Sequence, residues 1–156
     1  MSTYRFFVLA EPDLCHELHE NMTDLEFLEM FHAGNLPREA WTHEAHIRLA
    51  YLELKSNTFS EALKRVRRGI QLYNSAVLNK PDAYHETITV AYLQLIKNAM
   101  LQGVENFSQL RLYHPALFDR KLSALYRYYT QDRLMNNESR VRFVEPDIIP
   151  LPQITT

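Results

Sequence analysis

The sequence predicts an all-α protein: a single bundle of five or six helices, followed by an extended, proline-rich C-terminal tail. Three observations support this prediction. Apolar residues recur at intervals of three and four through most of the chain, as they do on one face of a helix. The chain has only 3 glycines, too few for a fold built on many tight turns. Its 156 residues are the length of one domain, so we expect residues 1–156 to form a single helical domain.

The first helix of the bundle is expected to begin after Thr23. Thr23 and Glu26 have the spacing of a capping box, in which each side chain caps the other residue's backbone N–H. Gly34 is expected to end this helix. Residues 1–22 precede it as an N-terminal arm, in which residues 4–9 form a strand or a docking arm.

Two helices are expected next. The first starts near Pro37, because proline suits the first helical turn, and runs to about Lys55. The second starts at Thr58, which again has a glutamate, Glu61, at capping-box spacing, and carries an apolar stripe to Tyr73.

The last helices of the bundle follow a break at residues 79–81. Asp82 is a good N-cap for a helix that reaches about Leu101, and this helix is apolar on nearly every side. Such a helix belongs in the middle of a bundle. We expect a short helix over residues 107–113 and one more over residues 118–130.

The C-terminal tail, residues 143–156, contains three prolines within seven positions and is expected to be extended. Arg140 and Arg142 stand just before it. We expect them to pair with Glu145 and Asp147 and to hold the tail against the bundle.

Charge and hydropathy limit the partners of this chain. Its 17 Lys and Arg residues against 19 Asp and Glu residues give a formal net charge of −2, so we expect no nucleic-acid partner. The basic run K-R-V-R-R at residues 64–68 includes Val66 of the apolar stripe, and its charges are therefore expected to form a solvated helix face. Residues 1–60 carry a net charge of −6 and residues 61–156 of +4, an asymmetry that suits a homo-oligomer.

The expected location is the cytoplasm. No apolar run is long enough to cross a membrane, so we expect no membrane partner. The apolar stretch near the start is too short for a signal peptide. The single cysteine excludes a thiolate-only metal cluster and an internal disulfide framework.

Two short histidine motifs carry the chemistry that the sequence predicts. Residues 41–46 read W-T-H-E-A-H, and His43 and His46, three apart, lie on one face of a helix. Residues 84–87 read Y-H-E-T, with His85 in what we expect to be the first turn of the central helix. Packing of the two helices would bring the three imidazoles together. Neutral imidazoles suit a divalent metal, Zn²⁺, Fe²⁺ or Ni²⁺, with positions left open for water or substrate.

Glu86 and Glu44 stand beside these histidines and offer a fourth ligand, a hydrogen-bond partner or a general base. We assign Glu86 the catalytic role of moving the proton. The alternative interpretation is that His43, His46 and His85 are structural residues at helix starts, hydrogen-bonded to the backbone or to neighbouring side chains.

A weaker metal-site pattern lies in the N-terminal arm. His16 and His19 are three residues apart beside Cys15 and could form a thiolate–imidazole site. No second half of such a motif is found elsewhere in the chain.

Four motifs together resemble those of a family of small, uncharacterised bacterial all-helical proteins. They are W-T-H-x-A-H at residues 41–46, Y-H-E-T-x-T at residues 84–89, Y-Y-T at residues 128–130, and F-V-x-P-D-x-x-P-L-P at residues 143–152. The resemblance covers roughly residues 25–152. It implies that the histidine cluster is a site and implies no particular reaction.

The sequence therefore supports two functional hypotheses. The first is a small divalent-metal-binding protein, a metal-dependent hydrolase or oxidoreductase that acts on a small molecule, with His43, His46 and His85 as metal ligands. The second is a non-catalytic helical binding or interaction module in which these histidines are structural.

Overall fold

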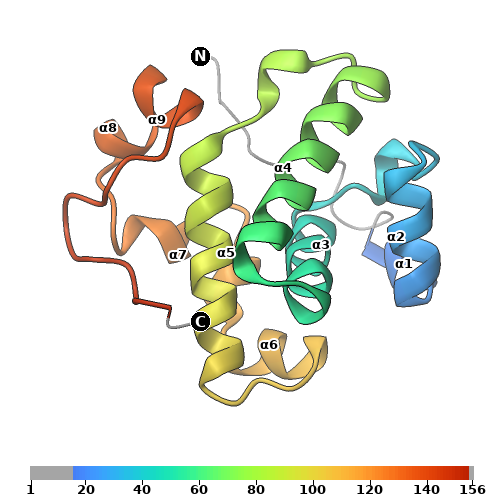
Figure 1. Ribbon diagram of the computed structural model, residues 1–156, viewed down its shortest axis with the longest axis horizontal. Helices are drawn as coiled ribbons and strands as arrows, with labels where there is room; N and C mark the ends of the chain where they lie inside the picture. The colour runs from blue at the N-terminus through green and yellow to red at the C-terminus, as the bar shows by residue number, and fades with distance from the viewer. Residues whose placement is uncertain (1–15, 155–156) are drawn as a thin grey trace.

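A computed structural model describes residues 16–154, which contain helices and no strand (Figure 1). The prediction of an all-α bundle is confirmed. Five α-helices of this part of the chain have seven residues or more: α2 (Asp24–His32), α3 (His43–Ser56), α4 (Phe59–Ala76), α5 (Glu86–Leu101) and α6 (Phe107–Tyr113). The shorter elements are α1 (His16–Glu20), α7 (Ser123–Tyr126), α8 (Gln131–Leu134), α9 (Asn137–Val141) and the 3₁₀ turns η1 (Arg38–Ala40), η2 (Pro81–Ala83) and η3 (Pro115–Phe118).

Helices α3, α4 and α5 pack against one another and form the centre of the molecule. In Figure 1, α2 flanks them on one side and α7, α8 and α9 on the other. Helix α5 is buried on most of its surface from Thr87 to Ala99, as its apolar sequence predicts. This arrangement leaves α4 with one apolar face inward and a basic face outward, which is the amphipathic pattern of its sequence.

Helix α3 is as central as α5 although it contains charged residues. Every residue from His43 to Leu54 is buried. The buried charges are satisfied by partners from other helices: Glu44 pairs with Arg111, Arg48 with Asp24, and Glu53 with Arg65 and His32. Because each buried charge has a partner, α3 can lie in the core without leaving an isolated ion there.

The helix starts confirm two of the predicted caps and correct a third. Thr23 forms the complete capping box with Glu26, and the Thr58 hydroxyl accepts a hydrogen bond from the Glu61 N–H. Asp82 is not the N-cap of the central helix, because residues 81–83 form the separate turn η2. The N-cap is His85, whose imidazole accepts from the Ile88 N–H.

The helix expected over residues 118–130 is interrupted. Leu122 has a left-handed backbone conformation (φ +63°), which a continuous right-handed helix cannot contain. The chain instead forms η3, the four-residue helix α7 and then α8. The Leu122 side chain is buried, so packing of this leucine against the core compensates for the local backbone cost.

The C-terminal tail contains no helix or strand over residues 143–154, as predicted. The contacts that hold the tail against the helices differ from those expected. Asp147 accepts hydrogen bonds from the backbone N–H and the hydroxyl of Thr130, and the Tyr129 hydroxyl donates to the Val144 carbonyl. Arg142 forms its ion pair with Glu138 of α9, one helical turn back, rather than with the tail.

The predicted N-terminal arm is partly helical, since residues 16–20 form α1. The strand or docking arm expected at residues 4–9, and Cys15 of the thiolate–imidazole pattern, lie outside the described residues. None of the helices in the described part of the chain combines the length and the apolar composition that a membrane crossing requires.

Candidate functional site

The histidines of the first motif lie at the start of α3 and bond to main-chain carbonyls. The Thr42 hydroxyl caps this helix by accepting from the Ala45 N–H. His43 donates from Nε2 to the Leu117 carbonyl at 2.8 Å, and His46 donates from Nδ1 to the Thr42 carbonyl at 2.7 Å. His46 also stacks on the indole of Trp41, with 3.6 Å between ring centroids. Burial lowers the pKa of His43 to about 4 and that of His46 well below its usual range, so both are neutral at physiological pH.

His85 uses both of its ring nitrogens within the fold. Nδ1 accepts a hydrogen bond from the Ile88 N–H at 3.2 Å, and Nε2 donates to the Leu134 carbonyl at 2.9 Å. Burial lowers the pKa of His85 to about 4. A metal ligand needs a free lone pair on a ring nitrogen. His85 could bind a metal only after giving up the bond that caps α5.

The structure does not place the three predicted ligands in a group of converging donor atoms. Among the described residues, the metal-ligating side chains whose ligand atoms all lie within 4.8 Å of one another belong to His19, Glu20 and Glu44. A metal at His85 would have to replace the hydrogen bond that caps α5, whereas the carbonyl bonds of His43 and His46 are of a kind that metal-ligating histidines also make with their second ring nitrogen. Their role as metal ligands stays a prediction.

Glu86 points away from His85. The backbone at His85 is extended (φ −131°, ψ 109°), and successive side chains of an extended segment point to opposite sides. His85 consequently faces the core, whereas Tyr84 and Glu86 face a surface cleft. The proton-transfer role expected of Glu86 stays a prediction, and any such role belongs to this cleft.

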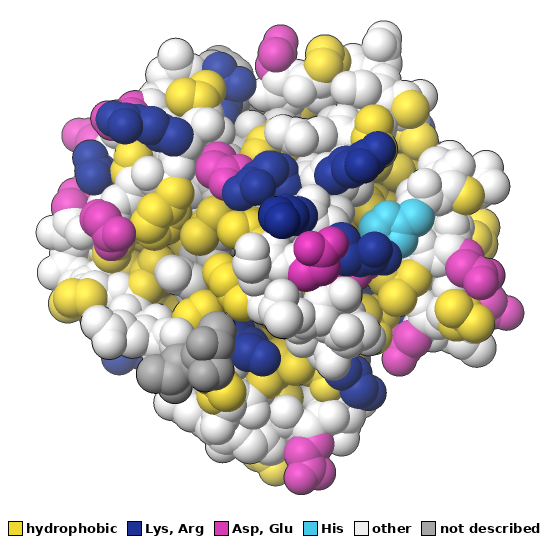
Figure 2. Space-filling view, in the orientation of Figure 1, with side chains coloured by type: hydrophobic (Ala, Val, Ile, Leu, Met, Phe, Trp, Pro, Cys, Tyr) yellow, Lys and Arg dark blue, Asp and Glu magenta, His cyan; other side chains and the backbone are white. Residues whose placement is uncertain are grey.

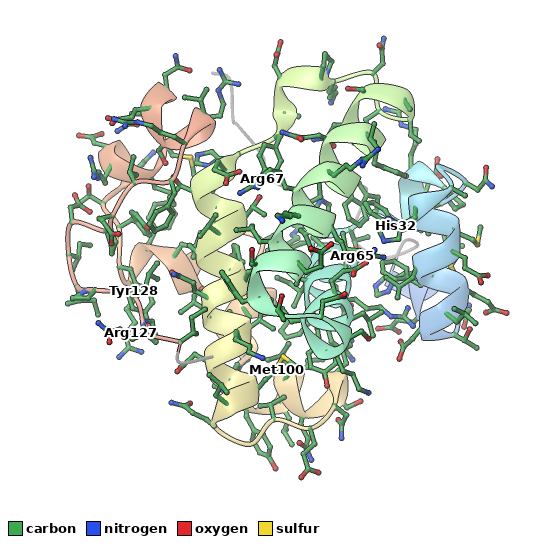
Figure 3. All side chains as sticks on the ribbon, in the orientation of Figure 1. His32, Arg65, Arg67, Met100, Arg127 and Tyr128 are labelled. Carbon is green, nitrogen blue, oxygen red and sulfur yellow. The ribbon has the colours of Figure 1, made fainter. Side chains whose placement is uncertain are left out.

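We call this the arginine cleft. It has a volume of about 480 Å³ and lies between α4, η2 and α9. The charged and polar side chains that line it are Arg67, Gln71, Asp82, Tyr84, Glu86, Arg140 and Arg142. Figure 3 labels Arg67 where α4 faces the start of α5.

The Glu86 carboxylate holds the inner wall of the arginine cleft together. It accepts two hydrogen bonds from the Arg67 guanidinium, at 3.0 Å from Nε and 2.5 Å from the terminal nitrogen, and a third from the Tyr84 hydroxyl at 2.5 Å. Burial and then the bond to Glu86 raise the pKa of Tyr84 above its usual range, so the hydroxyl stays protonated and donates. The bond to Glu86 likewise raises the pKa of Arg67, which stays charged.

The outer wall of the arginine cleft comes from the C-terminal part of the chain. Arg140 of α9 donates to the Asp82 carbonyl at 3.3 Å and to the Asn137 side chain at 3.0 Å. Arg142 follows α9 and pairs with Glu138. Three guanidinium groups thus line one cleft although they come from positions 67, 140 and 142. The sequence pattern predicts that Arg67 lies on a solvated helix face and that Arg140 and Arg142 hold the tail, and no spacing of residues connects the three arginines.

A second polar cluster lies where α1 meets the start of α3. His19 Nε2 is 3.7 Å from Glu44 Oε2, and Arg111 pairs with Glu44 and with Glu20, at 3.4 Å in the second pair. The Arg111 guanidinium also lies over the rings of Phe107 and Phe118. In this structure, therefore, an arginine supplies the positive charge that a metal ion would supply between the two carboxylates.

Nothing matches this chain in comparisons with protein-family models, with curated proteins and with solved structures. The geometry of these sites is therefore the basis on which function is inferred.

Proposed function

We propose that this chain is a small helical binding protein whose ligand is a small acidic molecule held in the arginine cleft. The observation that supports this proposal is the presence of Arg67, Arg140 and Arg142 around one cleft of about 480 Å³. Such a volume is in the range of sites for small organic molecules. Guanidinium groups match the planar carboxylate and the phosphate group, which they bind through paired hydrogen bonds.

The acidic residues of the cleft narrow the class of ligand. Glu86 and Asp82 offer acceptors beside the three guanidinium groups, so the site suits a molecule that carries an anionic group and also hydroxyl donors. A small phosphorylated or carboxylated polyol has both features. In this proposal Glu86, already held by Arg67 and Tyr84, orients a ligand hydroxyl.

The motif histidines have a structural role in this proposal. His85 caps α5 and thereby sets the position of its two neighbours, Tyr84 and Glu86. His43 fixes η3 against α3 through the Leu117 carbonyl. The interpretation of the chain as a binding module with structural histidines is thus the one that these hydrogen bonds favour.

Isothermal titration calorimetry tests the proposal with three named probes: inorganic phosphate, glycerol 3-phosphate and malate. We expect at least one of them to bind, and Arg67→Gln and Arg140→Gln to raise its Kd by at least tenfold. The matched control is Arg127→Gln, because Arg127 is exposed and does not line the cleft. The proposal is wrong if none of the probes binds at millimolar concentration, or if Arg67→Gln and Arg140→Gln bind as tightly as the wild type.

A second candidate function keeps the metal-dependent enzyme that the sequence suggests but uses other ligands. It is supported by the convergence of His19, Glu20 and Glu44, one imidazole and two carboxylates within 4.8 Å. Three protein ligands of this kind leave coordination positions for water or substrate, as in catalytic zinc sites. Binding of a metal would have to displace the Arg111 guanidinium from the two carboxylates.

Metal analysis of untagged protein distinguishes the possible sites. Stoichiometric zinc, iron or nickel that is lost in His19→Ala and kept in His85→Ala supports the second candidate. The reverse pattern supports the metal site predicted from His43, His46 and His85. Protein that contains no metal after purification, and binds none on addition of zinc, contradicts both metal sites.

A further inference from the structure

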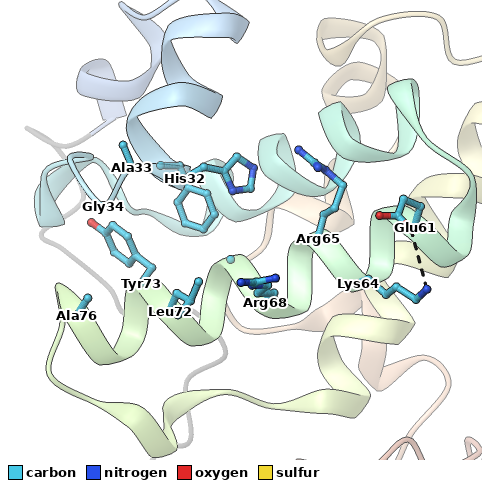
Figure 4. A pocket seen from close by; sticks show the side chains of 12 residues that line it. His32, Ala33, Gly34, Glu61, Lys64, Arg65, Arg68, Leu72, Tyr73 and Ala76 are labelled. Carbon is cyan, nitrogen blue, oxygen red and sulfur yellow. Dashed lines mark ion pairs between the residues drawn. The ribbon is translucent and has the colours of Figure 1, made fainter.

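Two neighbouring surface regions of opposite charge lie outside the proposed ligand site. The first, which we call the basic groove, has a volume of about 690 Å³ and lies between the C-terminal end of α2 and the outer face of α4 (Figure 4). Lys64, Arg65 and Arg68 stand along it, against the single acidic residue Glu61. Figure 3 shows Arg65 and His32 facing each other across this region.

The length of the basic groove suits a polypeptide partner. Its lining residues on α4 extend from Glu61 to Ala76, which at 1.5 Å per residue is roughly 22 Å. A small metabolite would fill only part of this length. Small residues at the α2 end leave room for a partner, since a Cβ added at Gly34 would meet no atom within 4 Å.

The floor of the basic groove distinguishes a protein partner from a nucleic acid. Leu72 is 57% exposed there and offers an apolar contact between the basic side chains. The rings of Phe31 and Tyr73 in the groove are each only 2% exposed and cannot stack on bases, and the exposed imidazole of His32 is held by its hydrogen bond to Glu53. Exposed rings are what single-stranded nucleic-acid sites require in addition to positive charge.

The second region, the acidic patch, has the complementary composition. It is the outer face of α2, where Leu25 is 65% exposed and Glu26 and Glu29 are exposed beside it. The opposite face of α2, with Phe27 and Phe31, is buried. In Figure 2, acidic side chains gather over α2 at the right, next to the Lys and Arg side chains over α4.

We propose that the basic groove binds the acidic patch of a second copy of this chain. Each region presents one exposed leucine, Leu72 or Leu25, among charges of a single dominant sign, so the contact would join apolar to apolar and positive to negative. Because the two regions adjoin on one side of the molecule, a two-fold dimer uses both contacts at once. The net charges of −6 in residues 1–60 and +4 in residues 61–156 agree with this pairing.

Sedimentation velocity over a wide range of protein concentrations tests the dimer. The wild type is expected to reach twice the 18.4 kDa of one chain, and to dissociate at high salt because screening weakens the charge contacts. Arg68→Glu and Leu72→Glu each raise the dimer Kd by at least tenfold, whereas Arg127→Glu, at an exposed arginine outside both regions, leaves it unchanged.

A charge exchange gives the sharper test. Glu29→Arg alone weakens the dimer, and Glu29→Arg combined with Arg68→Glu restores it, because the opposite charges again face each other across the interface. All of these positions are exposed, so the variants are expected to keep the wild-type circular dichroism spectrum. A mass of one chain at every concentration, assembly beyond a dimer, or failure of the double exchange to restore association would overturn the proposal.

Discussion

Replacement of His85 by alanine tests how the central helix begins. The variant removes the bond from the Ile88 N–H to Nδ1, and loss of an N-cap acceptor costs about 1 kcal/mol. It also removes the bond from Nε2 to the Leu134 carbonyl, worth about 1 kcal/mol. That carbonyl still accepts from the Ser139 hydroxyl at 2.8 Å, so it is not left unsatisfied. The buried imidazole leaves a cavity that costs about 1–2 kcal/mol more.

We therefore expect His85→Ala to lower the free energy of unfolding by about 3–4 kcal/mol. His85→Asn keeps a good N-cap acceptor and should recover about 1 kcal/mol of that loss. Urea unfolding followed by circular dichroism at neutral pH measures both values, with His114→Ala, outside the core, as the control. If His85→Ala unfolds within about 0.5 kcal/mol of the wild type, the capping argument is wrong.

Three further predictions concern pH, helix packing and a buried charge. The pKa values of His43 and His85 are about 4 in the folded protein and near 6.5 when unfolded, so the unfolded chain binds protons first as the pH falls. Stability is complete above about pH 6.5 and is lost toward pH 4, by about 2 kcal/mol per histidine at pH 5, as urea titrations at several pH values would show. Gly69→Ala should cost about 1–3 kcal/mol in the same assay, because the added Cβ would lie 2.7 Å from Phe31 Cε1. Arg48→Met should cost about 2 kcal/mol and increase hydrogen exchange in α1 and α2, because the Arg48 guanidinium donates to the carbonyl of His19 in α1 and to the carboxylate of Asp24 in α2.

Much of the helical framework could be predicted because it depends on local rules. The capping box at Thr23 and the short helix over residues 107–113 follow from residue types at fixed spacings. The break at Leu122 could not be predicted, because leucine ordinarily favours helices and only its tertiary packing holds it in a left-handed conformation. The burial of α3 could not be predicted for a similar reason, because its charged residues are paired with partners that are distant in the sequence.

The histidines show which features of a site the spacing of residues in the sequence does not predict. The spacing of His43 and His46 places both at the start of one helix, but it does not reveal which carbonyl each ring meets. The sequence predicts that the helix begins three residues before His85, which would place Glu86 about 100° from His85 around the helix axis. The extended backbone at His85 places Glu86 on the opposite side instead. The arginine cleft depends on contacts between α4 and α9, which no local pattern encodes.

The most direct test of this account is the state of the imidazole nitrogens of His43, His46 and His85, measured by long-range ¹H–¹⁵N NMR with and without equimolar zinc. If the three histidines are structural, each imidazole is neutral at neutral pH and His85 carries its proton on Nε2. Zinc then leaves the signals of all three rings unchanged. Zinc that shifts the signals of all three rings together would contradict the account and establish the shared metal site instead.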